Sequence, residues 1–173
     1  VDIPKDIQAQ KIEFKYPEEP VLIPGLPPIQ NPEIEDLEKA AKLIMAAKKP
    51  FILAGHGILI SGASKEVIQL AELANIPIGW TLLGSGAVPS SHPLNMGMMG
   101  MHGEFSVNNA IQEADLLIAC GMRFDDRVTG NAATYSPNSK KIHIEVDPSE
   151  INKNIKVDLG IIGDLRTVLK QLN

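Results

Sequence analysis

The chain has 173 residues, enough for one domain with a substantial core, and its formal charge of −5, pI near 5.4 and lack of a basic run argue against nucleic acid as a partner. Only 4% of the residues are aromatic, whereas 14 are glycine and 13 are proline, so the core must rely on aliphatic residues, as in an α/β sheet with many tight connections. Cys120 is the only cysteine and no apolar run approaches the roughly 20 residues that span a membrane, so we expect no internal disulfide, a buried thiol, no membrane partner and a cytoplasmic protein.

Residues 1–30 contain six prolines and keep neither a helical nor a strand period for long. This composition predicts an extended interdomain linker or arm, closed by Gly25 to Pro28. The chain begins with VDIPKDIQ and has no initiator methionine, from which we expect it to be part of a larger protein. The remaining residues, 31–173, form the second predicted unit.

A helix is predicted to start at Asn31 as the capping residue, with Pro32 in the first helical position. Apolar residues recur at spacings of three and four from Ile34, and the helix is expected to end near Lys48. Further helices are predicted at 64–75, about 104–113 and 165–172, and strands at 51–54, 77–81, 114–120, 141–146 and 159–162. The strand at 114–120 is apolar throughout, which predicts burial on both faces.

Helices and strands therefore alternate along the chain, as in the crossover units of a parallel sheet. The pattern predicts an α/β fold, a Rossmann-like three-layer sandwich whose mostly parallel sheet is flanked by helices.

Small and charged residues follow the predicted strands. Gly55 and Gly57 come after the first strand, where their backbone N–H groups are able to meet a phosphate. Taken alone, the motif favours a simple tight strand-to-helix turn, and no GxGxxG or P-loop pattern is present. After WTLLGSG at 80–86, the segment GMMGMHG at 97–103 offers either an apolar wall for a ring system, with Thr81 and His102 as polar groups, or a mobile loop whose methionines fill the core.

The loop after the strand predicted at 114–120 reads GMRFDDRVTG at 121–130 and carries two arginines and two aspartates. They suit either a solvated turn in which they pair with one another or an anion site in which Arg123 or Arg127 holds a phosphate or carboxylate. Glu145 ends a strand, where an acid binds ribose hydroxyls, caps a helix or is simply solvated. Gly163 and Asp164 follow the strand predicted at 159–162, and their minimum role is to cap the next helix. The four histidines have no metal-ligand spacing, and no metal site is predicted.

Four segments together resemble the central domain of the acetolactate synthase family, thiamine-diphosphate enzymes that begin branched-chain amino-acid synthesis. These are GMHG at 100–103, ADLLIACGMRFDDRVTG at 114–130, KIHIEVDPSEINKN at 141–154 and GD at 163–164. The resemblance covers nearly the whole chain, and it includes the opening VDIPKDIQ.

The resemblance implies that residues 31–173 form an FAD-binding central domain of a three-domain enzyme, with the flavin mainly structural. His56 lies between the two glycines at a point where the family has a glycine triplet. The implied cofactor-binding residues are Gly55, His56, Gly57, Thr81, Leu82, Leu83, Gly100, Met101, His102, Gly121, Met122, Arg123, Asp125, Arg127, Val128, Glu145, Val146, Glu150, Gly163, Asp164 and Leu165.

The resemblance also implies a transferase that condenses two pyruvates, or pyruvate and 2-oxobutanoate, to a 2-acetohydroxy acid. Thiamine diphosphate and Mg would be bound by the first and third domains, so no catalytic residue is expected here and the chain alone would be inactive. Arg127 would face the second 2-oxoacid. The implied partners are the enzyme's own other domains, further copies in a dimer or tetramer, and a regulatory subunit.

Two other interpretations stay open. The chain would be a structural central domain of another thiamine-diphosphate enzyme without a bound nucleotide, a role that does not require Arg123, Arg127 and Glu145 together. A stand-alone NAD-binding oxidoreductase domain is the third, and the lack of GxGxxG argues against it.

Overall fold

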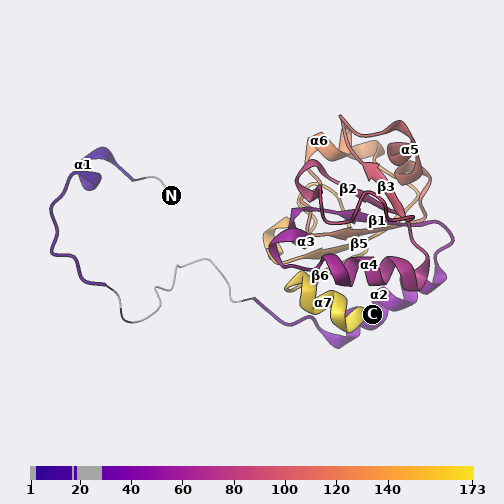
Figure 1. The fold of residues 1–173 in the computed structure, drawn as a ribbon, viewed down its shortest axis with the longest axis horizontal. Coiled ribbons are helices and arrows are strands. Elements are labelled where there is room, and N and C mark those ends of the chain that lie inside the picture. Colours follow the sequence, from indigo (N-terminus) through magenta and orange to yellow (C-terminus); the bar gives the residue numbers. More distant parts are fainter. Residues whose placement is uncertain (1–2, 17, 19–28) are drawn as a thin grey trace.

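The computed structural model describes residues 3–16, 18 and 29–173 (Figure 1). In the N-terminal segment every described residue from 3 to 16 is exposed, and one helical turn, α1 (Lys5–Gln8), interrupts the otherwise irregular backbone. Apart from this turn the described segment is irregular and exposed, and its role as an interdomain linker stays a prediction. The closing stretch from Gly25 to Pro28 lies outside the described residues.

Six parallel strands form a single sheet, which confirms the predicted α/β class. The strands are β1 (Pro50–Ala54), β2 (Ile78–Trp80), β3 (Asn95–Met98), β4 (Leu116–Cys120), β5 (Lys140–Glu145) and β6 (Leu159–Ile162). Their order across the sheet is β3-β2-β1-β4-β5-β6, with β1 and β4 side by side in the middle. The chain leaves β1 toward one edge and β4 toward the other.

Helices cover both faces of the sheet (Figure 1). One face packs against α2 (Ile34–Ala46), α3 (His56–Ile60), α4 (Ser64–Ala74) and α7 (Leu165–Leu172), and the other against α5 (Phe105–Glu113), with the short α6 (Asp126–Thr129) on the same side in Figure 1.

Alternate residues of a strand belong to the two hydrophobic cores, one on each face of the sheet, because successive side chains of a strand point to opposite faces. On β1, Ile52 and Ala54 belong to the core beneath α2, α4 and α7, whereas Phe51 and Leu53 belong to the core beneath α5. All five residues of β4 are buried, as its apolar run predicts.

Two sequence predictions are wrong in detail. The first long helix begins at Ile34 with Glu33 in the capping position, so Asn31 and Pro32 precede the helix, and Ile34 at its start is exposed. The strand β3 was expected to be loop. It has only four residues, includes Gly97 at φ 107°, and lies at the sheet edge, so it shows no apolar period.

Candidate functional site

The carboxyl ends of the six strands meet at one edge of the sheet, because all strands are parallel. Each cluster of predicted site residues follows one of these ends, so the fold brings segments from 55 to 165 to a common edge. The neighbours β1 and β4 send their chains in opposite directions, and such a switch point is where doubly wound sheets form their ligand crevice.

The glycine loops after β1 and β4 approach each other as closely as backbone allows. A β-carbon built on Gly57 would lie 2.7 Å from the Cα of Gly121, and one built on Gly55 would overlap the Gly121 carbonyl oxygen. The N–H of Gly55 donates to the Cys120 carbonyl at 2.9 Å, and that of Gly57 to the Gly121 carbonyl at 3.0 Å. These two N–H groups are thus already bonded, and the missing β-carbons leave room for the backbone of the facing loop.

The loop after β4 keeps both arginines in solvent. Arg123 lies 3.6 Å from Asp125, an ion pair whose arginine side chain is 66% exposed, and Arg127 on α6 is also exposed. Asp125 caps α6 by accepting a hydrogen bond from the Val128 N–H at 3.3 Å. The structure therefore contains part of each sequence interpretation: one internal ion pair, and cations still accessible to an anion.

The side chains after β2 and β3 form an apolar border to the edge. Leu82 and Leu83 are 71% and 61% exposed and Met101 is 60% exposed. Thr81 is buried, and its hydroxyl accepts a hydrogen bond from the Gly84 N–H at 3.1 Å. Exposed apolar side chains at a strand edge suit a planar ring system.

The side-chain amide of Asn108 accepts a hydrogen bond from the Gly100 N–H and donates one to the Gly100 carbonyl, each at 2.9 Å. A hollow of about 430 Å³ lies between this turn, α5 and α6, and Met101 and Val128 are among its lining residues. His102 and His56 are exposed at the same edge.

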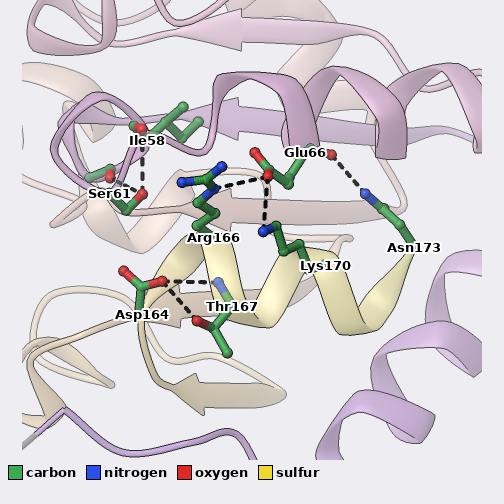
Figure 2. Close-up of polar contacts among 9 residues, drawn as sticks. Ile58, Ser61, Glu66, Asp164, Arg166, Thr167, Lys170 and Asn173 are labelled. Carbon is green, nitrogen blue, oxygen red and sulfur yellow. Dashed lines mark hydrogen bonds and ion pairs between the residues drawn. The ribbon is translucent and has the colours of Figure 1, made fainter.

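The ends of β5 and β6 carry the acidic groups. Burial raises the pKa of Glu145, although the Val146 N–H donates to its carboxylate at 2.9 Å. Glu150 pairs with Lys153 at 2.6 Å. Asp164 caps α7, accepting from the N–H and hydroxyl of Thr167 at 2.9 and 3.0 Å (Figure 2), as the sequence predicts at minimum.

Met122, Gly163 and Leu165, three of the predicted site residues, have little side chain to offer. Met122 and Leu165 are buried in the two cores, at 4% and 5% exposure, and Val146 N–H is bonded to its neighbour. Gly163 is also buried, and its N–H donates to the Glu145 carbonyl at 3.0 Å. Any contact of these residues with a ligand would run through backbone or, for Val146, through its half-exposed side chain.

Sequence reasoning missed the residues that hold the β4 loop. His143 on β5 is fully buried, with its Nε2 2.7 Å from the Met122 carbonyl oxygen, and Asn154 donates to the Arg123 carbonyl at 3.1 Å. Phe124 is buried at φ 51°. The available signal was a histidine inside the otherwise apolar β5 run, since a buried polar side chain requires a partner.

Within the described ranges no group of three His, Cys, Asp or Glu side chains is placed to hold a metal ion. In the same part of the chain, no helix has the length and apolar character needed to cross a membrane.

The strand order, with its switch point between β1 and β4, defines a doubly wound α/β domain whose candidate site residues lie at the strand carboxyl ends. Residues 37–172 match the family model described as the thiamine pyrophosphate enzyme, central domain, and the chain belongs to this family.

Curated relatives agree with the resemblance drawn from the sequence. The chain is 48% identical to a probable acetolactate synthase large subunit of Methanocaldococcus jannaschii, over 99% of this chain and 29% of the relative. It is 46% identical to the acetolactate synthase large subunit of Corynebacterium glutamicum, over 99% and 27%, and 41% identical to that of Haemophilus influenzae, over 99% and 30%. The chain thus spans less than a third of the length of these relatives.

Proposed function

We propose that this chain is the FAD-binding central domain of an acetolactate synthase catalytic subunit. The observation that carries the proposal is the switch point of the sheet, where the loops after β1 and β4 meet through glycine and the second loop carries two exposed arginines. The similarity to acetolactate synthase large subunits over 99% of the chain supports the same assignment.

The residues at this edge fit an adenine dinucleotide of the flavin type. Arg123 and Arg127 supply charge for the diphosphate, since guanidinium groups match phosphate oxygens. Glu145 at the end of β5 occupies the position from which an acid accepts ribose hydroxyls. The apolar residues Leu82, Leu83 and Met101 suit the ring system. When bound, the flavin would supply a rigid structural core to the site and no net redox step.

In the intact enzyme, thiamine diphosphate and Mg would be held by the first and third domains. The whole protein would act as a transferase that condenses two pyruvates, or pyruvate with 2-oxobutanoate. Arg127 would bind the carboxylate of the second 2-oxoacid, a task for which its planar fork is suited. The remaining partners would be further copies in a dimer or tetramer and a regulatory subunit, and the enzyme would be cytoplasmic. The chain alone, with its arm at 1–30 and its domain at 31–173, would be inactive.

A second function, a structural central domain without nucleotide, is favoured by one observation. The N–H groups of Gly55 and Gly57 are both bonded to carbonyls of the β4 loop, so these glycines already have a role in packing. On this alternative, the exposed arginines would contact only neighbouring domains or solvent.

FAD titration of the full-length protein that contains this chain separates the two. We expect quenching of flavin fluorescence in the wild type and a roughly tenfold to hundredfold weaker Kd in Arg123→Ala, because a charge-assisted hydrogen bond contributes about 1.5–3 kcal/mol. Lys42→Ala, at an exposed cation on α2, is the charge-matched control. No quenching by the wild type would reject the cofactor assignment.

The substrate assignment has its own test. Arg127→Ala should change the preference between pyruvate and 2-oxobutanoate in competition assays of the full-length enzyme. An unchanged preference would reject the role of Arg127 at the second 2-oxoacid and leave the FAD assignment to the titration.

A further inference from the structure

The loop after β4 is held by an imidazole beneath it. His143 is 0% exposed, and its Nε2 lies 2.7 Å from the carbonyl oxygen of Met122. Because a carbonyl only accepts, Nε2 must carry the proton and donate. The other ring nitrogen, Nδ1, is buried and has no partner among the described residues, so the ring has one bond to the loop and a lone pair on its far side.

The imidazole also supports the next part of the loop. The ring of Phe124 stands edge-on to His143, with centroids 5.0 Å apart at 77°, and edge-on to Tyr135 at 6.2 Å and 75°. Phe124 has φ 51°, a left-handed conformation that is costly for a bulky residue and persists only where the surroundings enforce it. The packing of its ring between His143 and Tyr135 provides that enforcement.

A third contact completes the support. The Asn154 side chain donates to the Arg123 carbonyl at 3.1 Å, so Arg123 is held by Asn154, whereas Met122 and Phe124 are both held by His143. Of these contacts, only that of His143 combines full burial with both a hydrogen bond and ring packing. These contacts fix the backbone of the loop that carries Arg123 and Arg127.

We propose that His143 is a positioning residue for the ligand loop, residues 121–128: its Nε2–H holds the Met122 carbonyl and its ring seats Phe124, so that the two arginines are presented at the strand edge in a fixed arrangement. The proposal deepens the proposed FAD site and rests on it for the identity of the ligand. Burial lowers the pKa of His143 and so favours the neutral ring, whose single proton the hydrogen bond to Met122 places on Nε2.

Three substitutions separate the hydrogen bond from simple filling of the core. His143→Gln carries an amide nitrogen at about the reach of Nε2, His143→Asn carries the same amide one bond shorter, and His143→Leu has no donor. Ile142→Val, on the same strand but in the opposite core, is the control for loss of stability alone.

The first measurement is amide hydrogen exchange of residues 121–128 in the full-length protein without FAD. We expect exchange to be about tenfold faster in His143→Asn and His143→Leu, and to be close to wild type in His143→Gln and Ile142→Val, since a tenfold change corresponds to the loss of about one net hydrogen bond. If residues 121–128 exchanged as slowly in His143→Asn as in the wild type, or equally fast in His143→Gln and His143→Asn, the positioning role would be overturned.

The second measurement is the Kd for FAD in the same proteins, with the melting temperature recorded beside it. Affinity should fall about tenfold in His143→Asn and return in His143→Gln, whereas Ile142→Val should lower the melting temperature and leave the Kd unchanged. If the wild type bound no FAD, the proposed function would fail, and hydrogen exchange would still decide the role of His143.

A third readout needs no variant. ¹⁵N NMR of the wild-type imidazole should show the neutral tautomer with its proton on Nε2. A proton on Nδ1 would remove the hydrogen bond to Met122 and overturn the proposal.

Discussion

Gly57 and Gly121 face each other across the centre of the sheet, each in the place where the other's β-carbon would be. A β-carbon on Gly57 would lie 2.7 Å from the Cα of Gly121, and one on Gly121 would lie 2.6 Å from the Cα of Gly57. The hydrogen bond from Gly57 N–H to the Gly121 carbonyl, at 3.0 Å, crosses the same gap. The loops after β1 and β4 therefore pack this closely because neither residue carries a β-carbon.

Gly121→Ala should destabilise the chain more than Gly62→Ala. The two glycines have nearly equal φ angles of 62° and 64°, but a β-carbon on Gly62 meets nothing within 4 Å. Gly62→Ala thus reports left-handed strain alone, about 1–2 kcal/mol, and Gly121→Ala adds about 1–3 kcal/mol for the clash with backbone. Urea unfolding of both variants measures the difference. Equal losses would mean that the β1 and β4 loops move apart at little cost.

Asp164 is predicted to matter for stability through its cap and not through its charge. Its carboxylate accepts from the Thr167 N–H and hydroxyl at the start of α7 (Figure 2). Asp164→Asn keeps an acceptor and should melt close to wild type, whereas Asp164→Ala should lose about 1 kcal/mol, or roughly 2–4 °C for a chain of this size. Thermal unfolding monitored by circular dichroism checks both. If Asp164→Asn lost as much stability as Asp164→Ala, the capping role would be contradicted.

The end of the chain shows where sequence reasoning succeeds. The bounds predicted for β6 and α7 are those observed, because a short apolar strand, a capping aspartate and a helical period follow one another without ambiguity. Parallel strands also made the shared edge of the site predictable, since their carboxyl ends must coincide.

Other features depended on contacts that no local pattern contains. β3 is held by pairing with β2 and not by an apolar alternation of its own. Asn31 and Pro32 satisfy the rules for a helix start, yet the helix begins at Ile34, three residues before its first buried side chain, Leu37. The partner of His143 lies 21 residues earlier in the chain, so the sequence showed a polar residue in a strand without showing what it holds.

Glu66 should make stability depend on acid pH. It is 7% exposed, and its Oε1 accepts from the Arg166 Nε at 3.1 Å, with Lys170 at 4.0 Å (Figure 2). The hydrogen bond from Arg166 is the main cause that lowers its pKa from the ordinary 4.5, and a backbone hydrogen bond and the charges of Arg166 and Lys170 act in the same direction.

Because the folded-state pKa of Glu66 is lowered, the stabilisation is present above about pH 4.5 and is lost as the pH falls through the folded value. Glu66→Gln should be less stable than wild type at neutral pH and should lose less stability on acidification. Glu38→Gln, at an exposed carboxylate 4.0 Å from Lys42, is the matched control and should follow the wild-type curve. Parallel pH profiles for wild type and Glu66→Gln would show that α7 docks without this ion pair.

Glu145 should make stability depend on pH in the opposite direction. Its ionised form should lower stability and favour FAD binding. Burial is the main cause that raises its pKa above the ordinary 4.5, with the nearby Glu150 and Asp147 acting in the same direction. The folded state then binds more protons than the unfolded state, so stability falls as the pH rises from about 4.5 through the folded-state pKa. Glu145→Gln should remove this fall and be more stable than wild type at pH 7.

The same variant should bind FAD more weakly, because an amide is a poorer acceptor for ribose hydroxyls than a carboxylate. We expect about a tenfold rise in Kd alongside the higher melting temperature, a combination that damage to the fold does not produce. Glu104→Gln, at an exposed carboxylate before α5, serves as the charge-matched control and should change neither the Kd nor the melting temperature. A Glu145→Gln variant that gained stability and kept its affinity would place the ribose elsewhere on the strand edge, whereas a loss of stability at pH 7 would show that the ionised carboxylate is better solvated than its burial implies.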